Sequence, residues 1–271
     1  MHHHKMAVLA AFAIWIVSAA TAQSTSTPPL LAFAASSATN AIEDIAKRYE
    51  AEGHGRVITV FDATSRAARQ IAQGAPAHLL ISANPVWTQW LAACGHGIGA
   101  TTRKIASGEM VLVAPVGSTL KTSLPLNAHH PAFAVRRLAI ADPAGVPAGV
   151  YARETLVDLG VWEDLSPRLL TGDNVRTILG WVSAGAVDAA LVYATDAAIT
   201  DSVITLARVP AALHSPISYE AVATSTPHPK TQHFLDYLQT ATAQNIFAAH
   251  GFLPPLNDAP APALAVQPAC G

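Results

Sequence analysis

Charged and aromatic residues are both scarce in this chain of 271 residues. Only 13% of the positions are Asp, Glu, Lys or Arg, the formal net charge is −2, and aromatic residues make up 6%. Binding of nucleic acid needs clustered positive charge and, for single strands, aromatic stacking platforms, so the composition argues against such a partner. The hydrophobic fraction of 51% excludes a disordered chain and allows a well-buried core.

Cysteine is scarce as well. The two cysteines, Cys94 and Cys270, are far apart, and neither has the Cys-x-x-Cys or Cys/His spacing that is typical of zinc sites. Cys270 is near the end of a tail rich in Pro and Ala, which gives no geometric reason for a disulfide with Cys94. We therefore expect no structural metal, and the state of the two cysteines stays open.

The first residues have the organisation of a leader. Lys5 and three histidines precede an apolar run from Met6 to Ala20, and the small-x-small segment Ala20-Thr21-Ala22 follows. These are the parts of a secretory signal peptide, so residues 1–22 are predicted to be cleaved after Ala22 and the mature chain to be exported. An uncleaved anchor is the alternative, but the run is shorter than the roughly 20 residues of a membrane-spanning helix.

Strands and helices alternate along the mature chain. Short apolar segments predict strands at residues 30–35, 57–61, 79–82, 109–115, 138–141 and 189–193. Apolar residues at helical spacing predict helices between Asn40 and Gly53, Thr64 and Gly74, and Val86 and Gly95, then at residues 151–159 and 175–184, and from Pro227 to about Phe247. The polar loop 117–131 separates two such series. The pattern predicts an α/β fold of two lobes, with a ligand between them.

Hydroxyl residues begin two of the predicted helices, as Ser36-Ser37 and Thr64-Ser65. The first amides of a helix have no partners within the helix and lie at the positive end of its dipole, and Ser or Thr hydroxyls add further donors. Two such helix starts, side by side at the ends of parallel strands, would form a cradle for an anion without Lys or Arg. Ordinary N-capping is sufficient to explain each pair taken alone.

Several segments carry a family resemblance. In the first half they are Phe33 to Ala41, Ala67 to Ile71, Gly74 to Ala77, and Ile81 to Asn84; in the second half they are Asp142-Pro143, Val146 to Tyr151, Asn174-Val175-Arg176, and Leu191 to Ala197. In this order the chain, from about Leu30 to Leu253, resembles the periplasmic molybdate-binding proteins of ABC importers, a type II solute-binding protein family.

The resemblance implies a hinged periplasmic binding protein, in which each lobe has a central, mostly parallel sheet flanked by helices. We expect the first lobe at residues 30–113 and 221–254, the second lobe at 114–220, and a disordered tail at 255–271. The implied protein is a periplasmic monomer and not an enzyme. It would capture molybdate, and also tungstate, and deliver it to an ABC permease, without a cofactor or a separate cation site.

The resemblance also implies a set of ligand-binding residues. Ser37 and Thr64 would offer their hydroxyl and amide groups, Ala148 and Val175 their backbone N–H groups, and Tyr193 its phenolic O–H. A set of neutral donors suits a tetrahedral dianion that carries no proton, because a protonated anion needs an acceptor. Selection of molybdate over sulfate would then depend on the size of the cavity.

The sequence departs from the family at two positions near this set, and a third residue, Asp62, bears on its geometry. His78 and Asn84 stand where the family has acidic residues, and we interpret both as local changes. Asp62 lies just before Thr64, and its carboxylate would oppose an anion if it faced the pocket.

Two alternatives stay open. One is a protein that binds sulfate or another tetrahedral oxyanion. The other is a serine hydrolase that uses Ser118 and Lys121 of a Ser-x-x-Lys segment, although the chain lacks the Lys-Thr-Gly and Ser-Asp-Asn partners of that motif. The histidines of His129-His130, and His228 with His233, have no accompanying carboxylates, so we expect solvated loop residues there and no cation site.

Overall fold

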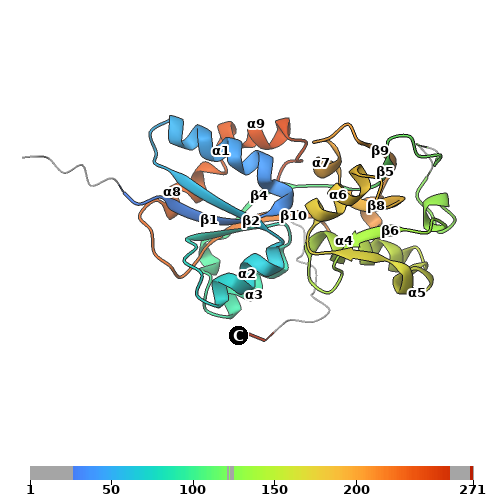
Figure 1. Ribbon diagram of the computed structural model, residues 1–271. Helices are drawn as coiled ribbons and strands as arrows, with labels where there is room; N and C mark the ends of the chain where they lie inside the picture. The colour runs from blue at the N-terminus through green and yellow to red at the C-terminus, as the bar shows by residue number, and fades with distance from the viewer. Residues whose placement is uncertain (1–26, 121, 123–124, 257–268, 271) are drawn as a thin grey trace, which may run out of the picture.

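The structure is a computed structural model that describes residues 27–120, 122, 125–256 and 269–270. The predicted signal peptide, residues 1–22, lies outside this range, and so does most of the predicted tail. The described chain forms two α/β lobes, each built on one five-stranded sheet (Figure 1). None of the helices in the described ranges is long and apolar enough to cross a membrane.

The first lobe is built on a sheet with the strand order β2-β1-β3-β10-β4. Its strands are β1 (Leu30–Ala35), β2 (Val57–Asp62), β3 (Leu79–Ser82), β4 (Arg103–Ser107) and β10 (Ser218–Ala223). Its helices are α1 (Thr39–Ala51), α2 (Thr64–Ala72), α3 (Pro85–Ala93), α8 (Thr231–Tyr237) and α9 (Ala241–Ala249). Helices α1, α8 and α9 lie on one face of the sheet, and α2 and α3 lie on the other (Figure 1).

The second lobe repeats this plan with the strand order β7-β6-β8-β5-β9. Its strands are β5 (Met110–Pro115), β6 (Leu138–Ala141), β7 (Leu170–Gly172), β8 (Ala189–Tyr193) and β9 (Val203–Arg208). Its helices are α4 (Pro147–Asp158), α5 (Trp162–Leu165), α6 (Val175–Ser183) and α7 (Ala194–Ala197). The two lobes confirm the expected α/β architecture.

Each sheet contains one reversed strand, and in each case it is the first strand after the chain crosses between the lobes. β5 pairs antiparallel with β8, and β10 pairs antiparallel with β3. The first residue of β5, Met110, lies opposite Tyr193, the last residue of β8. When the chain enters a sheet at the end where the other strands have their carboxyl ends, the entering strand must be antiparallel to them. Both crossings therefore lie at the edge that also carries the helix starts.

The chain passes between the lobes at positions that differ from the predicted lobe boundaries. A limit at residues 113/114 divides β5, which pairs entirely within the second sheet. A limit at residues 220/221 divides β10, which pairs entirely within the first sheet. The strands place the crossings between Ser107 and Met110 and between Arg208 and Ser218.

Some predicted elements differ from the structure. The single helix predicted from Pro227 to about Phe247 is two helices, α8 and α9, because the chain turns at residues 238–240 and Thr240 caps the second helix. Helix α4 begins at Pro147, four residues before the predicted start. Strands β4, β7, β9 and β10 were not predicted at all.

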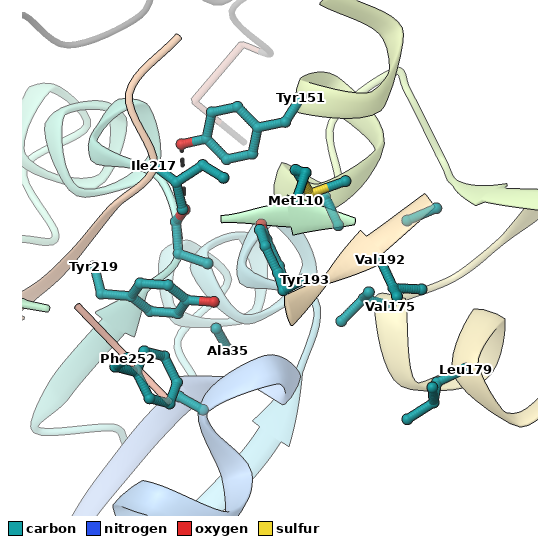
Figure 2. Packing of buried hydrophobic residues seen from close by; sticks show 14 of the residues in the cluster. Ala35, Met110, Tyr151, Val175, Leu179, Val192, Tyr193, Ile217, Tyr219 and Phe252 are labelled. Atoms are coloured by element: carbon teal, nitrogen blue, oxygen red, sulfur yellow. Dashed lines mark hydrogen bonds between the residues drawn. The ribbon is translucent and has the colours of Figure 1, made fainter. Parts of the chain in front are cut away.

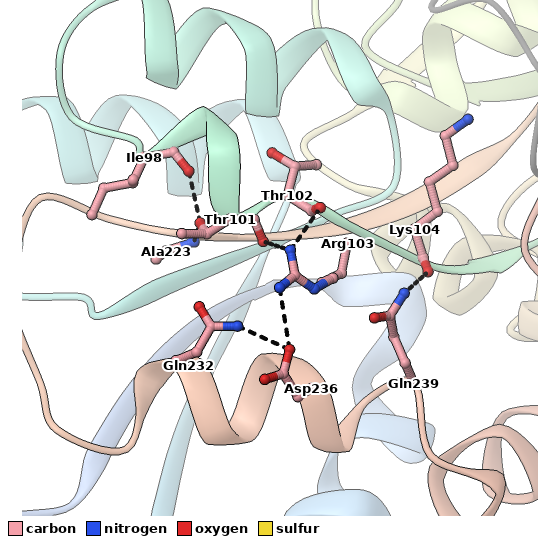
Figure 3. A network of polar contacts seen from close by, with 9 residues as sticks. All are labelled: Ile98, Thr101, Thr102, Arg103, Lys104, Ala223, Gln232, Asp236 and Gln239. Carbon is pink, nitrogen blue, oxygen red and sulfur yellow. Dashed lines mark hydrogen bonds and ion pairs between the residues drawn. The ribbon is translucent and has the colours of Figure 1, made fainter.

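Strand β4 is attached to α8 by a polar network (Figure 3). The Arg103 guanidinium lies 3.2 Å from Asp236 Oδ1 and also donates to the carbonyl oxygens of Thr101 and Thr102. Gln239 donates to the carbonyl oxygen of Lys104 over 3.4 Å. These contacts attach the C-terminal helices to the sheet of the first lobe.

A disulfide joins Cys94 to Cys270, with the two Cα atoms 5.4 Å apart. Cys94 is the C-cap residue of α3, so the end of the chain is held against the first lobe. The composition of the tail gave no reason to expect this pairing, because it depends on where the folded lobe brings the end of α3. The prediction of a disordered tail does not hold for Cys270, and residues 257–268 and 271 lie outside the described residues.

Candidate functional site

A small pocket lies between the two lobes, and all five predicted ligand-binding residues line it: Ser37, Thr64, Ala148, Val175 and Tyr193. None of the residues that the structure puts around this pocket carries a charge. The cavity volume is only about 10 Å³, roughly the space needed for one water molecule and far below the roughly 300–1,000 Å³ of pockets for drug-sized ligands. The pocket is therefore narrow, and the groups around it are neutral.

Three buried hydroxyl residues of the first lobe line the pocket: Ser36 and the two predicted ligand-binding residues, Ser37 and Thr64. Strands β1 and β2 are parallel neighbours, so their carboxyl ends bring Ser37 and Thr64 to the same edge. Ser37 is 3% exposed and Thr64 is 1% exposed. Thr64 Oγ1 accepts a hydrogen bond from the backbone N–H of Ala83 (3.1 Å), and Ser37 Oγ lies 2.8 Å from the Tyr219 hydroxyl.

The second lobe contributes two helix starts. Ala148 is the second residue of α4, and Val175 is the first residue of α6. Amides in the first turn of a helix have no partner within the helix, so these N–H groups are available to a ligand. Asn174 uses its side chain to accept from the N–H of Thr177, which leaves the N–H of Val175 to the pocket side. The helix starts of both lobes thus converge on one space.

Tyr193 closes the pocket from the end of β8. Its side chain is 1% exposed, and its hydroxyl has no hydrogen-bond partner among the residues that the structure describes. Burial raises the pKa of this hydroxyl well above 10, and the neighbouring Tyr219, Tyr151 and Asp196 raise it further. Tyr193 therefore stays protonated and can donate. The Tyr193 ring makes edge contacts with the rings of Tyr151 and Tyr219, at centroid distances of 6.4 and 6.1 Å (Figure 2).

The two departures from the family, His78 and Asn84, have local roles outside the pocket, and so does Asp62. Asp62 accepts from the backbone N–H of Ala63 (2.7 Å) and pairs with Arg66, so its carboxylate is engaged elsewhere. His78 accepts from the N–H of Leu31, and Asn84 caps helix α3. None of the three lines the pocket.

Hydrogen bonds from side chains to backbone oxygens cross between the lobes around the pocket. They run from Trp87 Nε1 to Gly145 (2.9 Å), from the Tyr151 hydroxyl to Ala83 (3.4 Å), and from Arg176 Nη2 to Ser37 (3.4 Å). Each of these bonds requires the lobes to be close together. The structure therefore has the closed arrangement of the two lobes.

The other candidate positions do not form a comparable site. Ser118 Oγ accepts from the backbone N–H of Leu120, and Lys121 lies outside the described residues. His130 is 3% exposed and accepts from the N–H of Ala132, so the expectation of a solvated histidine was wrong there. Within the described ranges, no group of three His, Cys, Asp or Glu residues could hold a metal ion.

Sequence reasoning missed Tyr219, which contacts Ser37 from β10. Its strand went unrecognised because Glu220 interrupts the apolar segment Ser218–Ala223. In the fold, Glu220 is 6% exposed and accepts from the Thr88 hydroxyl (2.6 Å). No signal in the sequence brings Tyr219 to Ser37, since 182 positions separate them.

Known proteins resemble this chain along most of its length. A family model described as bacterial extracellular solute-binding protein matches residues 30–253. The molybdate-binding protein ModA of Escherichia coli (strain K12) is 38% identical over 232 residues, which cover 81% of this chain and 87% of that protein. The ModA of Haemophilus influenzae is 31% identical over 223 residues, covering 81% of this chain and 88% of that protein.

A solved structure shows the same fold. The periplasmic molybdate-binding protein of Azotobacter vinelandii superimposes with a TM-score of 0.73 at 23% identity, covering 84% of this chain and 100% of that chain. The family model spans both lobes and the pocket between them. The chain therefore belongs to the bacterial extracellular solute-binding proteins.

Proposed function

We propose that this protein captures molybdate, and also tungstate, between its lobes and delivers it to the membrane permease of an ABC importer. Two features support the proposal: a pocket lined only by neutral groups, and relatives whose names state molybdate binding. In this proposal the chain acts as a monomer in the periplasm, after its leader is removed. It uses no cofactor, and molybdenum is present only within the bound oxyanion.

The Tyr193 hydroxyl carries the proposal. It is a buried donor without a partner among the described residues, and it lines the pocket. Leaving such a group unsatisfied costs about 1–3 kcal/mol. An oxyanion oxygen would remove this cost by accepting the bond.

The remaining donors would complete a cage around the anion. Ser37 and Thr64 would bind from the first lobe, and the amides of Ala148 and Val175 would bind from the second. Hydrogen bonds to a charged group contribute about 1.5–3 kcal/mol each, so five or more of them exceed the cost of association. Hinge closure would bring the two sets together around the ligand.

The experiment that tests the proposal is calorimetric titration of residues 23–271 with molybdate, tungstate and sulfate. We expect saturable one-to-one binding of molybdate and tungstate that a large excess of sulfate does not displace. Displacement by sulfate would favour the broader oxyanion-binding function. A folded protein that does not bind molybdate would contradict the proposal.

Two substitutions test the site itself. Ser37→Ala and Tyr193→Phe each remove one donor, and each is expected to weaken molybdate binding roughly 10- to 150-fold without unfolding the protein. Tyr237→Phe is the matched control, because this hydroxyl bonds to Glu52 in the first lobe and does not line the pocket. Unchanged affinity in both site variants would contradict the assignment of these residues.

A further inference from the structure

Every residue that the structure puts around the pocket is buried. A ligand bound there would leave only after the lobes separate, so contacts that exist only in the closed arrangement affect the rate of its release. Of the three hydrogen bonds from side chains to backbone oxygens across the lobes, the bond from Trp87 Nε1 to Gly145 is the shortest, at 2.9 Å against 3.4 Å. Neither Trp87 nor Gly145 lines the pocket.

Gly145 packs directly on side chains of the first lobe. A Cβ atom at this position would lie 3.3 Å from Arg69 Nη2, 3.4 Å from Trp87 Cζ2 and 3.8 Å from Ser65 Cβ. The Arg69 guanidinium in turn lies over the Trp87 ring, 5.0 Å from its centroid. Because Gly145 has no side chain, the loop of the second lobe can reach the indole.

The loop that carries Gly145 leads into the pocket. Asp142 accepts from the N–H of Ala144 with its side chain (2.9 Å) and from the N–H of Val146 with its backbone oxygen (3.0 Å). Val146 lines the pocket, and Ala148, a proposed ligand donor at the start of α4, follows Gly145 by three positions. A contact at Gly145 therefore acts on the proposed site without touching the ligand.

We propose that Trp87 is a positioning residue that stabilises the closed lobes: its indole binds Gly145, holds the start of α4 against the first lobe, and so slows the release of bound ligand. This inference rests on the proposed function, since it concerns how long the same pocket keeps its ligand. Because Trp87 does not contact the ligand, it should affect dissociation and not association.

The contact favours closure because it forms only when the lobes meet. In the closed arrangement Trp87 is 1% exposed and Gly145 is buried. Separation would expose the part of the indole that Gly145 covers, and it would break a hydrogen bond that is shielded from water. The ion pair of Arg66 with Asp173 (3.1 Å) also crosses between the lobes, but its side chains are 47% and 71% exposed. Water and salt weaken such a pair, so we expect the buried contact to matter more.

The test measures the association and dissociation rates of radiolabelled molybdate for the unaltered chain, Trp87→Phe and Gly145→Leu. Trp87→Phe removes the indole N–H, and we expect dissociation to become about three- to tenfold faster while association changes by less than about twofold. Gly145→Leu puts a side chain where the indole lies in the closed arrangement, and dissociation should become about 10- to 100-fold faster. Loss of affinity through slower association alone would overturn the inference.

Two further variants are matched controls. Trp162→Phe removes an indole that contacts Arg153 within the second lobe, and Arg66→Gln removes the exposed ion pair at the boundary between the lobes. Both should keep the dissociation rate within about twofold of that of the unaltered chain. Thermal unfolding checks that each variant folds. If Trp87→Phe is unstable, Gly145→Leu still tests the contact, because it changes the other lobe. An unchanged dissociation rate in Gly145→Leu, or an equal acceleration in Arg66→Gln, would overturn the inference.

The double variant Trp87→Phe/Gly145→Leu separates this role from packing inside the first lobe. Both substitutions break one contact, so adding Trp87→Phe to Gly145→Leu should accelerate dissociation by less than about twofold. The same acceleration with and without Gly145 would show that Trp87 acts only within its own lobe, which would overturn the inference but leave molybdate capture intact. Absence of molybdate binding by the folded, unaltered protein would instead contradict the proposed function and, with it, the inference.

Discussion

Arg176 and Asp196 form an ion pair next to the pocket, with Nε 2.5 Å from Oδ1. Asp196 is completely buried, and it follows Tyr193 by three positions. Arg176 follows Val175, and its Nη2 also donates to the carbonyl oxygen of Ser37 in the other lobe. The pair therefore connects three of the five pocket residues across the boundary between the lobes.

Removing the Arg176 guanidinium while keeping Asp196 should lower the stability of the protein. Arg176→Met leaves the Asp196 carboxylate buried without a charged partner, and we expect a loss of about 3–5 kcal/mol in the free energy of unfolding at pH 7. The double variant Arg176→Met/Asp196→Asn should recover much of this loss, since no buried charge remains. Urea denaturation measures both, and equal stabilities of the single and double variants would contradict the expectation.

Asp196 should also give an unusual dependence of stability on pH. Burial raises its pKa from 3.8 to about 6, against the lowering effect of Arg176. The folded state then binds a proton more tightly than the unfolded state, so the Asp196 contribution favours folding below pH 4 and declines as the pH rises through 6. At about 1.4 kcal/mol for each pKa unit, the decline amounts to about 3 kcal/mol. The Asp196→Asn variant is expected to lack this decline in stability. If the stability of the variant and of the unaltered protein changed with pH in parallel, Asp196 would not be the cause of the decline.

Gly149 allows α4 to approach the end of β6. A Cβ at this position would lie 2.2 Å from the carbonyl oxygen of Ala141 and 2.4 Å from that of Asp142. Both are backbone atoms, so Gly149→Ala should displace the start of α4, lower stability by about 1–3 kcal/mol, and weaken ligand binding through Ala148.

Gly180 is the matched control for that substitution. It also lies within a helix, α6, but a Cβ there would meet nothing within 4 Å. Gly180→Ala should therefore raise stability by about 0.5–1 kcal/mol. Thermal unfolding and molybdate titration of both variants check this contrast. A change in stability in the same direction for both substitutions would contradict it.

The Cys94–Cys270 disulfide should contribute to stability but not to the site. Neither cysteine lines the pocket. Replacing both by Ser is expected to lower the free energy of unfolding by about 2–4 kcal/mol and to leave molybdate affinity unchanged. Denaturation with and without a reducing agent provides the comparison, and a change in affinity on reduction would show that the tail influences the pocket.

Local pattern in the sequence was enough to predict much of the fold. Strands β6 and β8 have the predicted limits, and α2 begins at Thr64 as expected. Continuous apolar runs predict buried strands, and helical spacing after a hydroxyl residue predicts a helix start, because both depend on neighbours in the chain. Of the strands that were missed, β4 begins with two charges, β10 contains Glu220, and β7 is only three residues long.

The sequence by itself determined the alternation of strands and helices, the two lobes, and the hydroxyl residues at the helix starts. Only the tertiary structure decided that β10 enters between β3 and β4, and therefore that Tyr219 reaches Ser37. It likewise decided the burial of Asp196 beside Arg176 and the pairing of Cys94 with Cys270. These contacts join residues distant in the sequence, and their partners are set by how helices and sheets pack, which no local pattern encodes.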